Sequence, residues 1–291
     1  SLRVEDIEWL ADDGATILLR KSKTDQHGSG KWIHLTNEAS YALHQWLLAA
    51  QVNEVLIFRG ARSSGVITDG LVVSLDASSF SSSPGSGASW TNQVAGPTFT
   101  LPNGATYSSS NGGTLTFARS SQQSAHGTSP GSALTTFTAE TWVNLDAIDN
   151  TSGNATCTIT EVYNNTPINY AISNGLAGSP NIWQGGYFAG GAWHLAGTFT
   201  PTANTWYCMA VTYDGTNVKF YVDGALDATT ASAVTPGSSG LGINIGERWD
   251  VPNYPLSFLN GSVPVVRLYN RALTAAEIQQ NYNANKAKYG L

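Results

Sequence analysis

Two aromatic clusters in the second half of the chain contain the residue types that bind sugars. The stretch "PNIWQGGYFAGGAWHL" spans residues 180–195, and "GERWDVPNYP" spans residues 246–255. Sugar sites combine aromatic faces with a few polar groups that hydrogen-bond hydroxyls. The candidate ligand-binding residues in these clusters are Trp183, Tyr187, Trp193, Trp249, Asp250, Asn253 and Tyr254. The alternative is that the rings fill a core or cap its rim, although "RWDVPNYP" reads as a loop.

Carboxylates are the groups to test for sugar cleavage, because a glycosidase needs two of them across a cleft. Glu140 stands in "FTAETWVNLD" and Glu161 in "TITEVYN", and neither has a second acid on the same face of its run. Both fit solvent-facing strand positions. The metalloprotease motif HExxH and the P-loop motif do not occur in the sequence. We therefore expect no catalytic residues and no enzymatic activity, with glycan hydrolysis as a third hypothesis.

Metal and disulfide chemistry have little support in the sequence. Calcium needs several oxygen ligands within reach of one another. The acids that would supply them are scattered, at Asp76, Asp214, Asp223 and Asp250. We expect Asp214 and Asp223 to be turn residues, so no cofactor is predicted and calcium stays an open alternative. Cys157 and Cys208 match no zinc spacing; we expect buried thiols, with an inter-strand disulfide as the alternative.

The composition favours a β protein and argues against two classes of partner. Charged residues make up 12% of the 291 residues, and the chain holds 30 glycines and nine tryptophans, which suits many strands joined by turns. The net charge of −6 argues against a chain-wide nucleic-acid surface, which would be basic. No run reaches the roughly 18 apolar residues of a membrane span, and no signal-peptide pattern opens the chain.

The chain changes character near residue 66. Residues 1–66 hold 15 charged side chains, whereas the remaining 225 residues hold 19. We therefore expect two domains, 1–66 and 67–291. In the first, "ATILLRKS" and "KWIHL" predict a hairpin around the "DQHGSG" turn. "TNEASYALHQWLLAA" has a helical apolar stripe that Thr36 or Asn37 would cap, so this domain is predicted to be a small α+β unit.

The second segment alternates short strand patterns with turns, which predicts a two-sheet sandwich or jelly roll. In "NVKFYVDG", Val218 and Phe220 should point to one face and Lys219 and Tyr221 to the other. The expected strands are "GLVVSLDA", "PTFTLP", "GTLTFA", "FTAETWVNL", "CTITEVYN", "INYAIS", "WHLAGTF", "WYCMAVTYDG", "NVKFYVDG", "GINIGE" and "VPVVRLYN".

The last part of the sequence predicts a strand followed by a closing helix. Pro264 within "VPVVRLYN" implies a sheet edge or a bulge, because proline donates no ladder hydrogen bond. Arg267 and Arg271 are expected to be structural surface charges. In "TAAEIQQNYNANKAKYG", Thr274 and Glu277 form a capping-box pattern at the helix start.

Ordered motifs of the second segment resemble a known family. They are "GLVVSLDASSFSSSPGSGASWTNQVAG", "GATYSSSNGGTLTF", "WYCMAVTYDGTNVKFYVDGAL" and "FLNGSVPVVRLYNRALTAAEIQQNYNANKAKYGL". Together they resemble laminin-G-like, concanavalin-A-like jelly-roll domains, most of all those of virion structural and tail-fibre-type proteins of tailed phages. The resemblance covers residues 70–291. It implies a lectin-like module that binds carbohydrate or protein, and some such domains hold calcium.

The first segment resembles part of the catalytic domain of phage-type tyrosine recombinases. "VEDIEWLADDGATILLRKSKTDQHGSGKWIHLTNEASYALHQWLLAAQ" and "LIFRG", within residues 1–62, follow that family's order of strand, lysine hairpin and helix. Lys23 falls at the hairpin lysine, which the resemblance implies is a general acid. The family's first arginine, its HxxR motif and its tyrosine nucleophile have no counterparts in the sequence. Because phosphoryl transfer needs several cooperating groups, we interpret Lys23 as vestigial.

Three interpretations of the first segment stay open. It is an anchoring or assembly element, a weak DNA contact, or an artificial join between unrelated sequences. The DNA contact would use Arg20, Lys21, Lys23 and Lys31. A steep salt dependence of binding would distinguish it, because phosphate contacts release counterions.

The leading hypothesis is therefore a mainly β protein that binds without catalysing a reaction. We predict a jelly-roll sandwich with a small N-terminal α+β domain, engaging a glycan or protein surface on a phage particle or outside the cell as an adhesion module. A homo-oligomer or virion lattice is the expected assembly, and neither nucleic acid nor membrane is an expected partner. The rival hypothesis is a degenerate integrase-derived DNA-binding protein.

Overall fold

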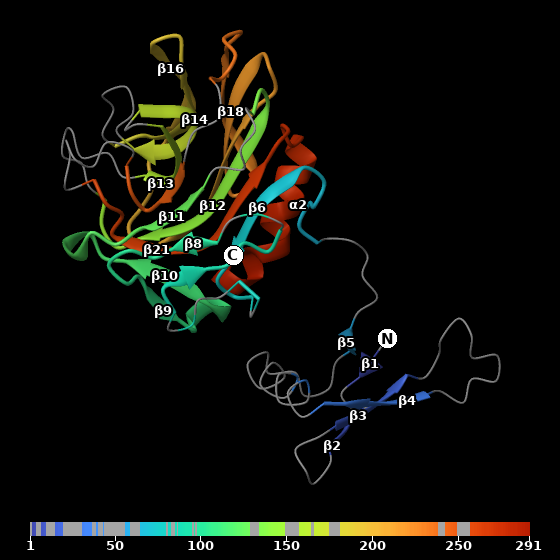
Figure 1. Cartoon of the computed structure of the whole chain (residues 1–291). Helices are drawn as coiled ribbons and strands as arrows, with labels where there is room; N and C mark the ends of the chain where they lie inside the picture. The colour runs from blue at the N-terminus through green and yellow to red at the C-terminus, as the bar shows by residue number, and fades with distance from the viewer. Residues whose placement is uncertain are drawn as a thin grey trace. The chain divides into compact units, whose positions relative to one another are not determined.

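The computed structural model resolves the chain into two compact units, Ser1–Ser64 and Gly65–Leu291, and each is described by itself (Figure 1). The structure describes residues 2–3, 7–9, 15–19, 31–36, 39, 43, 56–58, 65–79, 81–82, 85, 87–94, 96, 98–128, 134–148, 157–163, 166–174, 181–237, 242–248 and 257–291.

The smaller unit contains the predicted hairpin. β3 (Ala15–Leu19) pairs antiparallel with β4 (Lys31–Leu35), and β2 (Ile7–Trp9) pairs with the other edge of β3. β1 (Leu2–Arg3) pairs separately with β5 (Leu56–Phe58). Ala39 is helical, and its backbone N–H donates to the Thr36 hydroxyl at 3.3 Å, as a helix cap would. The turn that holds Lys23 lies outside the described residues.

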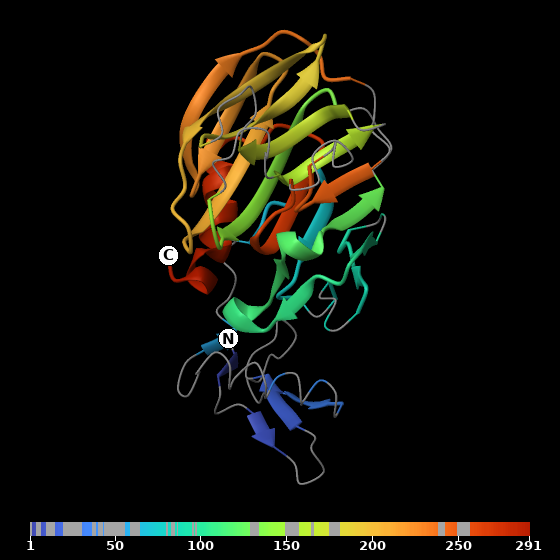
Figure 2. The same cartoon turned by 90° about the vertical axis from the view of Figure 1, so that its left-hand side faces the viewer.

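The larger unit is a sandwich of two antiparallel sheets, which confirms the predicted fold class (Figures 1 and 2). The first sheet runs β19 (Ala225–Ala231), β18 (Asn217–Val222), β17 (Trp206–Tyr213), β12 (Phe137–Leu145), β21 (Gly261–Tyr269), β10 (Thr114–Phe117) and β9 (Thr106–Ser108), with β6 (Leu71–Asp76) beside β21. The second sheet runs β16 (Ala192–Phe199), β15 (Trp183–Ala189), β14 (Thr166–Asn174), β13 (Cys157–Tyr163), β20 (Gly242–Ile245), β11 (Ala125–Thr128), β8 (Phe99–Thr100) and β7 (Ser89–Trp90). Short 3-10 turns occupy Ser110–Gly112, Arg119–Ser121 and Lys286–Tyr289.

Each strand that the sequence predicted for this unit is present, and β7, β9, β11, β15 and β19 were not predicted. Pro264 lies at a bulge, as expected. On one side of β21, β10 pairs with it up to Val263 and β6 pairs with it from Val265 onward. On the other side, the register with β12 shifts between Trp142 and Asn144. The ladder is interrupted there, so the missing N–H of proline breaks no regular pairing.

The core lies between the two sheets and is rich in aromatic rings. Phe137 of the first sheet packs against Tyr170 and Tyr187 of the second, with ring centroids 5.8 and 6.1 Å apart. The alternation predicted in β18 is confirmed, because Phe220 faces this core while Tyr221 packs on the opposite face. Both cysteines are buried thiols without a disulfide, Cys157 in the second sheet and Cys208 in the first, which confirms the prediction.

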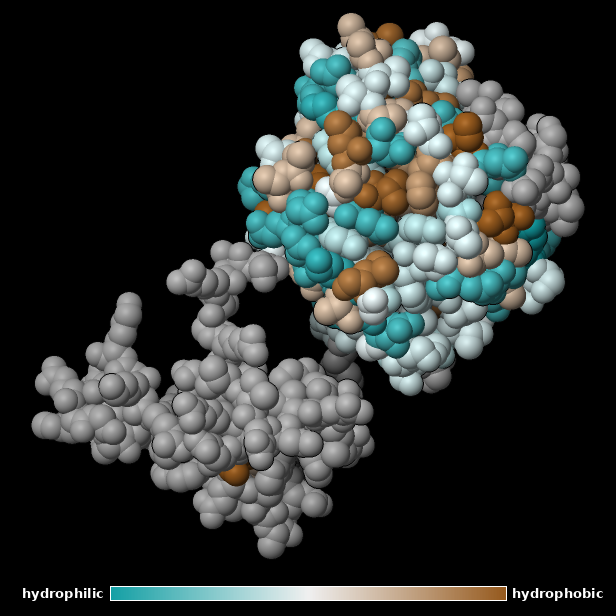
Figure 3. Space-filling view, turned by 180° about the vertical axis from the view of Figure 1, so that it is seen from behind, coloured by the Kyte–Doolittle hydropathy of each residue, from teal (hydrophilic) through white to brown (hydrophobic). Residues whose placement is uncertain are grey.

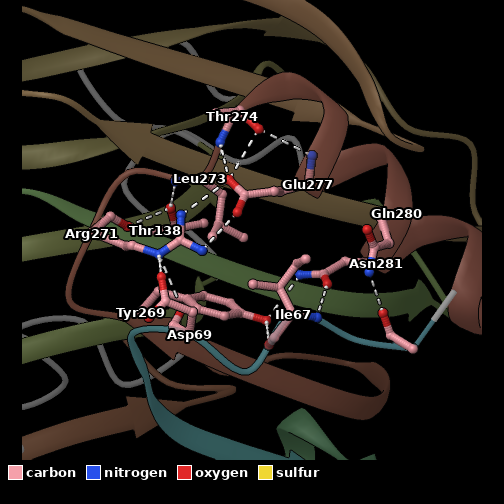
Figure 4. A network of polar contacts seen from close by, with 11 residues as sticks. Ile67, Asp69, Thr138, Tyr269, Arg271, Leu273, Thr274, Glu277, Gln280 and Asn281 are labelled. Carbon is pink, nitrogen blue, oxygen red and sulfur yellow. Dashed lines mark hydrogen bonds and ion pairs between the residues drawn. The ribbon is translucent and has the colours of Figure 1, made fainter. Parts of the chain in front are cut away.

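The outer face of the first sheet is covered by helix α2 (Ala275–Asn285). The predicted capping box is present, since Thr274 accepts the backbone N–H of Glu277 and the Glu277 carboxylate accepts that of Thr274 (Figure 4). Trp142 on the sheet stacks on Tyr282 of the helix, with ring centroids 5.7 Å apart. Within the described part of the chain, no helix is long and apolar enough to cross a membrane.

A buried polar network lies under this helix and corrects two expectations. Glu140 was expected to face solvent and Arg267 to be a surface charge, yet both are buried and form an ion pair. Asn281 of α2 donates to the other Glu140 oxygen at 2.8 Å and to the Tyr269 hydroxyl at 2.9 Å. Asn281 also accepts the backbone N–H of Ile67 at 2.8 Å (Figure 4). The expectation failed because the helix excludes water from a sheet face that would otherwise be wet.

Candidate functional site

One residue from each of seven strands forms a row across the outer face of the second sheet. Ile159, Ile243 and Ile245 point into the core, so their strand neighbours point outward. The pairing register joins one outward residue per strand into a row that consists of Thr100, His126, Asn244, Thr160, Ala171, Gly186 and Leu195. The row is polar on β8, β11 and β20, small in its middle, and apolar on β16.

The polar end of the row contains an oriented imidazole. His126 Nε2 lies 2.5 Å from a Glu247 carboxylate oxygen and 3.0 Å from the Ser124 hydroxyl. The His126 side chain is 41% exposed, whereas that of Glu247 is 13% exposed. Thr100 is exposed and Asn244 half-buried on the flanking strands. We call these five residues the polar patch.

The geometry of the polar patch orients the imidazole and does not activate Ser124. A nucleophile relay uses the two imidazole nitrogens for different partners, one for the nucleophile and one for the orienting acid. Here Ser124 and Glu247 both contact Nε2 of His126. Ser124 is also buried. The arrangement therefore presents a fixed hydrogen-bonding group to solvent.

The position of Glu247 is set by the chain segments around it. Glu247 forms an isolated bridge with Phe258, and the Arg248 backbone N–H donates to the Ser257 carbonyl at 3.1 Å. The Arg119 side chain donates to the Phe258 carbonyl at 2.8 Å. These contacts fix both ends of the loop predicted to bind ligand. Its predicted residues Trp249, Asp250, Asn253 and Tyr254 lie outside the described residues.

The other aromatic cluster divides between the two faces of β15 and β16. Trp183 and Tyr187 are buried in the core, so neither ring is open to a ligand. For these two residues the alternative stated from the sequence, that the rings fill a core, is confirmed. Burial is the main cause that raises the pKa of Tyr187, whose hydroxyl contacts Ser232 at 2.8 Å. Trp193 instead lies half-buried on the outer face, edge-on to Phe188 at 5.5 Å. Of the predicted aromatic residues that the structure describes, Trp193 is the one placed where a ligand could reach.

The middle of the outer face carries small residues. Thr160, Ala171 and Gly186 are buried there. A Cβ atom at Gly186 would collide with the His194 carbonyl oxygen, so glycine is required for the close approach of β15 and β16. Glu161, expected to face solvent, is buried beside Tyr170. The pKa of Tyr170 is raised by burial first and by the Glu161 charge second.

The acids considered for calcium that the structure describes serve other structural roles. Asp76 accepts the backbone N–H and hydroxyl of Ser78. Asp214 accepts the backbone N–H groups of a tight turn and pairs with Lys219 at 2.9 Å. Asp223 has a positive φ in a turn, as expected, and Asp250 lies outside the described residues. Within the described ranges, no three His, Cys, Asp or Glu side chains gather as a metal site would need.

Comparison with known proteins places the chain in a fold family. A family model described as the concanavalin A-like lectin/glucanases superfamily matches residues 119–279. No curated protein matches the sequence. Solved structures of similar fold include the receptor-binding domain of botulinum neurotoxin type G, at 14% identity and a TM-score of 0.54 over 74% of this chain and 51% of that one.

Two further structures extend the comparison. The ligand-binding domain of botulinum neurotoxin serotype D, solved with N-acetylneuraminic acid, is 11% identical with a TM-score of 0.57, over 75% of this chain and 51% of that one. Trypanosoma rangeli sialidase is 17% identical with a TM-score of 0.56, over 97% of this chain and 44% of that one. The chain therefore spans about half the length of these proteins or less. At such identities the likeness shows the fold alone.

Proposed function

Because the chain belongs to the concanavalin A-like lectin/glucanase superfamily, we propose that its larger unit binds carbohydrate without cleaving it. The polar patch on the outer face of the second sheet would be the centre of the site. The observation that carries this proposal is the half-exposed imidazole of His126, held by Glu247 and flanked by Thr100 and Asn244.

The chemistry of this face suits sugar hydroxyls. An imidazole, an amide and a hydroxyl offer donors and acceptors in fixed directions, which is how binding sites select among hydroxyl arrangements. Glu247 limits the rotation of the His126 ring, so less conformational entropy is lost when a ligand binds. Trp193, at the far end of the same face, supplies an aromatic surface of the kind that packs on sugar rings.

We infer binding without turnover from the positions and partners of three glutamates. A glycosidase places two carboxyl groups on either side of a scissile bond. Glu140 is buried against Arg267 under α2, and Glu161 is buried beside Tyr170. Glu247 is committed to His126. None of these three is placed to act as an acid and base pair across a bound sugar.

For the whole chain we propose a role in attachment, on a virion or outside the cell. The smaller unit would serve as an anchoring or oligomerising element, and protein is an alternative ligand for the larger unit. The larger unit has few charged residues, and on the face in Figure 3 exposed apolar residues stand singly or in small groups among hydrophilic ones. DNA binding by the smaller unit is the rival, and a steep fall in affinity with salt would favour it.

A glycan array followed by calorimetry, each with and without calcium, tests the proposal. We expect at least one glycan to bind, and His126→Ala to lower its affinity about tenfold, which corresponds to about 1.4 kcal/mol. Leu226→Ala, an exposed change on β19 of the first sheet, is the control and should leave affinity unchanged. Turnover of a bound glycan would overturn the non-enzymatic part. Silence across the array, or equal affinity in His126→Ala, would overturn the site.

A further inference from the structure

A second surface of the sandwich has a different chemical character from the polar patch. A hollow of about 550 Å³ is lined by Gly85, Gly87 and Ala88, which lead toward β7, and by Gly104, Thr106 and Tyr107, which lead into β9. β7 and β9 are the last described strands on this side of the second and first sheets. The hollow therefore lies at an edge of the sandwich and is separate from the outer face of the second sheet.

The chain segment that lines the hollow carries no charged side chain. Residues 77–118 include every residue that lines the hollow, and they contain no Asp, Glu, Lys, Arg or His. Serine, threonine, asparagine and glycine dominate the stretch. A charged ligand would find no counter-ion among the lining residues, whereas a neutral polar ligand could exchange water for the hydroxyl groups of Thr106 and Tyr107.

One wall of the hollow is held rigid before any ligand arrives. Gln123 is buried, and its side-chain amide donates to the carbonyl oxygens of Asn103 and Gly104 at 3.1 and 2.7 Å. Its side-chain oxygen accepts the Ala118 backbone N–H at 2.8 Å. Asn103 and Gly104 both have positive φ, and a Cβ atom at Gly104 would meet only open space. The turn is thus held in position by its own hydrogen bonds, and Gly104 leaves open space in the hollow, so less order has to be gained when a ligand binds.

The hollow also has an aromatic component. Tyr107 is half-buried and packs against the core while lining the hollow. The exposed part of this side chain offers an aromatic surface that a sugar ring could cover. The volume lies within the range of small-ligand pockets, about 300 to 1,000 Å³.

From these observations we propose that this edge hollow is a second carbohydrate site, selective for neutral saccharides. An extended peptide fits the edge less well, because strand addition depends on a run of main-chain hydrogen bonds. β7 has two residues and β9 has three. The proposal does not depend on the polar patch, since the two surfaces share no residue.

Calorimetry on the full chain with a panel of neutral hexasaccharides (maltohexaose, cellohexaose, laminarihexaose and xylohexaose) tests this site. We expect Tyr107→Ala to weaken binding of a panel member about fivefold, and Tyr107→Phe to preserve it. Ala88→Trp fills the hollow from an exposed position and should abolish binding. It keeps the test decisive if Tyr107→Ala does not fold. His126→Ala should leave this binding unchanged, which separates the two sites.

Heteronuclear NMR gives an independent readout. Addition of the bound hexasaccharide should shift the backbone amide signals of Gly85 and Gly104, and the same addition to Ala88→Trp should not. The proposal is overturned if no neutral hexasaccharide binds, if Ala88→Trp binds as well as the parent chain, or if sialylated oligosaccharides bind the hollow more tightly than neutral ones.

Discussion

The two outer faces of the sandwich each carry a glutamate paired with a nitrogen-containing side chain, in opposite settings. On the first sheet, Glu140 and Arg267 are buried under α2, with side chains 0% and 3% exposed. On the second sheet, Glu247 holds His126 at the surface. Each pair joins a glutamate to a nitrogen-containing side chain. The two pairs differ in exposure because a helix covers only the first of the two faces.

Whether a helix covers the face determines the role of each pair. Under the helix, the remaining Glu140 oxygen is satisfied by Asn281, which also bonds Tyr269 and the Ile67 backbone. A buried pair whose carboxylate also accepts a hydrogen bond from Asn281 holds the helix in position and is closed to ligands. On the open face, the His126 imidazole keeps hydrogen-bonding capacity directed at solvent. The first pair is therefore structural, and the second is a candidate for recognition.

The same substitution on the two faces should have unequal effects on folding. Glu140→Gln leaves the Arg267 guanidinium buried without a counter-charge, and we expect a loss of about 3 kcal/mol in the free energy of unfolding. Glu247→Gln, on the open face, should cost less than about 1 kcal/mol. Urea unfolding followed by tryptophan fluorescence measures both. Equal losses in the two variants would show that coverage is not what separates the pairs.

Binding should respond in the reverse order. Glu247→Gln keeps a hydrogen-bond acceptor but removes the charge that holds the imidazole, so we expect glycan affinity to fall about threefold to tenfold. The comparison for this measurement is Asn244→Ala, which removes a neighbouring polar group of the same row without touching His126. Calorimetry on both variants separates orientation of His126 from direct contact. An unchanged affinity in Glu247→Gln would mean that orientation of the ring does not matter.

The sequence predicted the fold better than it predicted what covers each face. "FTAETWVNL" coincides with β12, Phe137–Leu145, because its alternation and its β-branched and aromatic residues are local signals. β19, "ALDATTA", lacks such a pattern and is held as a strand by its pairing with β18. The prediction that Glu140 faces solvent was wrong for a simple reason. Alternation along a strand separates its two faces, but it does not show which other element covers either face. The helix that covers it begins at Ala275, far along the chain.

The candidate site was harder to predict for a related reason. Its members lie on β8, on β11 and just before it, on β20, and two residues beyond β20, and strand pairing brings them together. His126 stands in "SAHGT", which carries no aromatic or acidic signal. One local signal was available: Asn244 lies between Ile243 and Ile245, so a polar side chain on the outer face could be inferred. The sequence did predict Trp193 as a candidate. That Trp193 faces outward while Trp183 and Tyr187 face the core could be seen only once the limits of β15 and β16 were known.

A further expected effect concerns the attachment of the covering helix, and it depends on pH. The Arg271 guanidinium, together with Thr274, lowers the pKa of Glu277 from its ordinary 4.5 to about 2. Folding therefore favours the ionised carboxylate. The stabilisation is complete above about pH 5 and is lost as the pH falls through about 2.

Glu277→Gln should remove about 1 kcal/mol from the free energy of unfolding at pH 7, because the side chain is 25% exposed and its charge is screened. The difference from the parent chain should shrink as the pH falls from 5 toward 2.5. Asp69→Asn is the matched control. Asp69 also contacts Arg271, at 2.9 Å, but its side chain is 86% exposed, so the loss should be close to zero. A Glu277→Gln deficit that stays constant across this pH range would show that the capping hydrogen bonds, and not the charge, hold this end of the helix on the covered face.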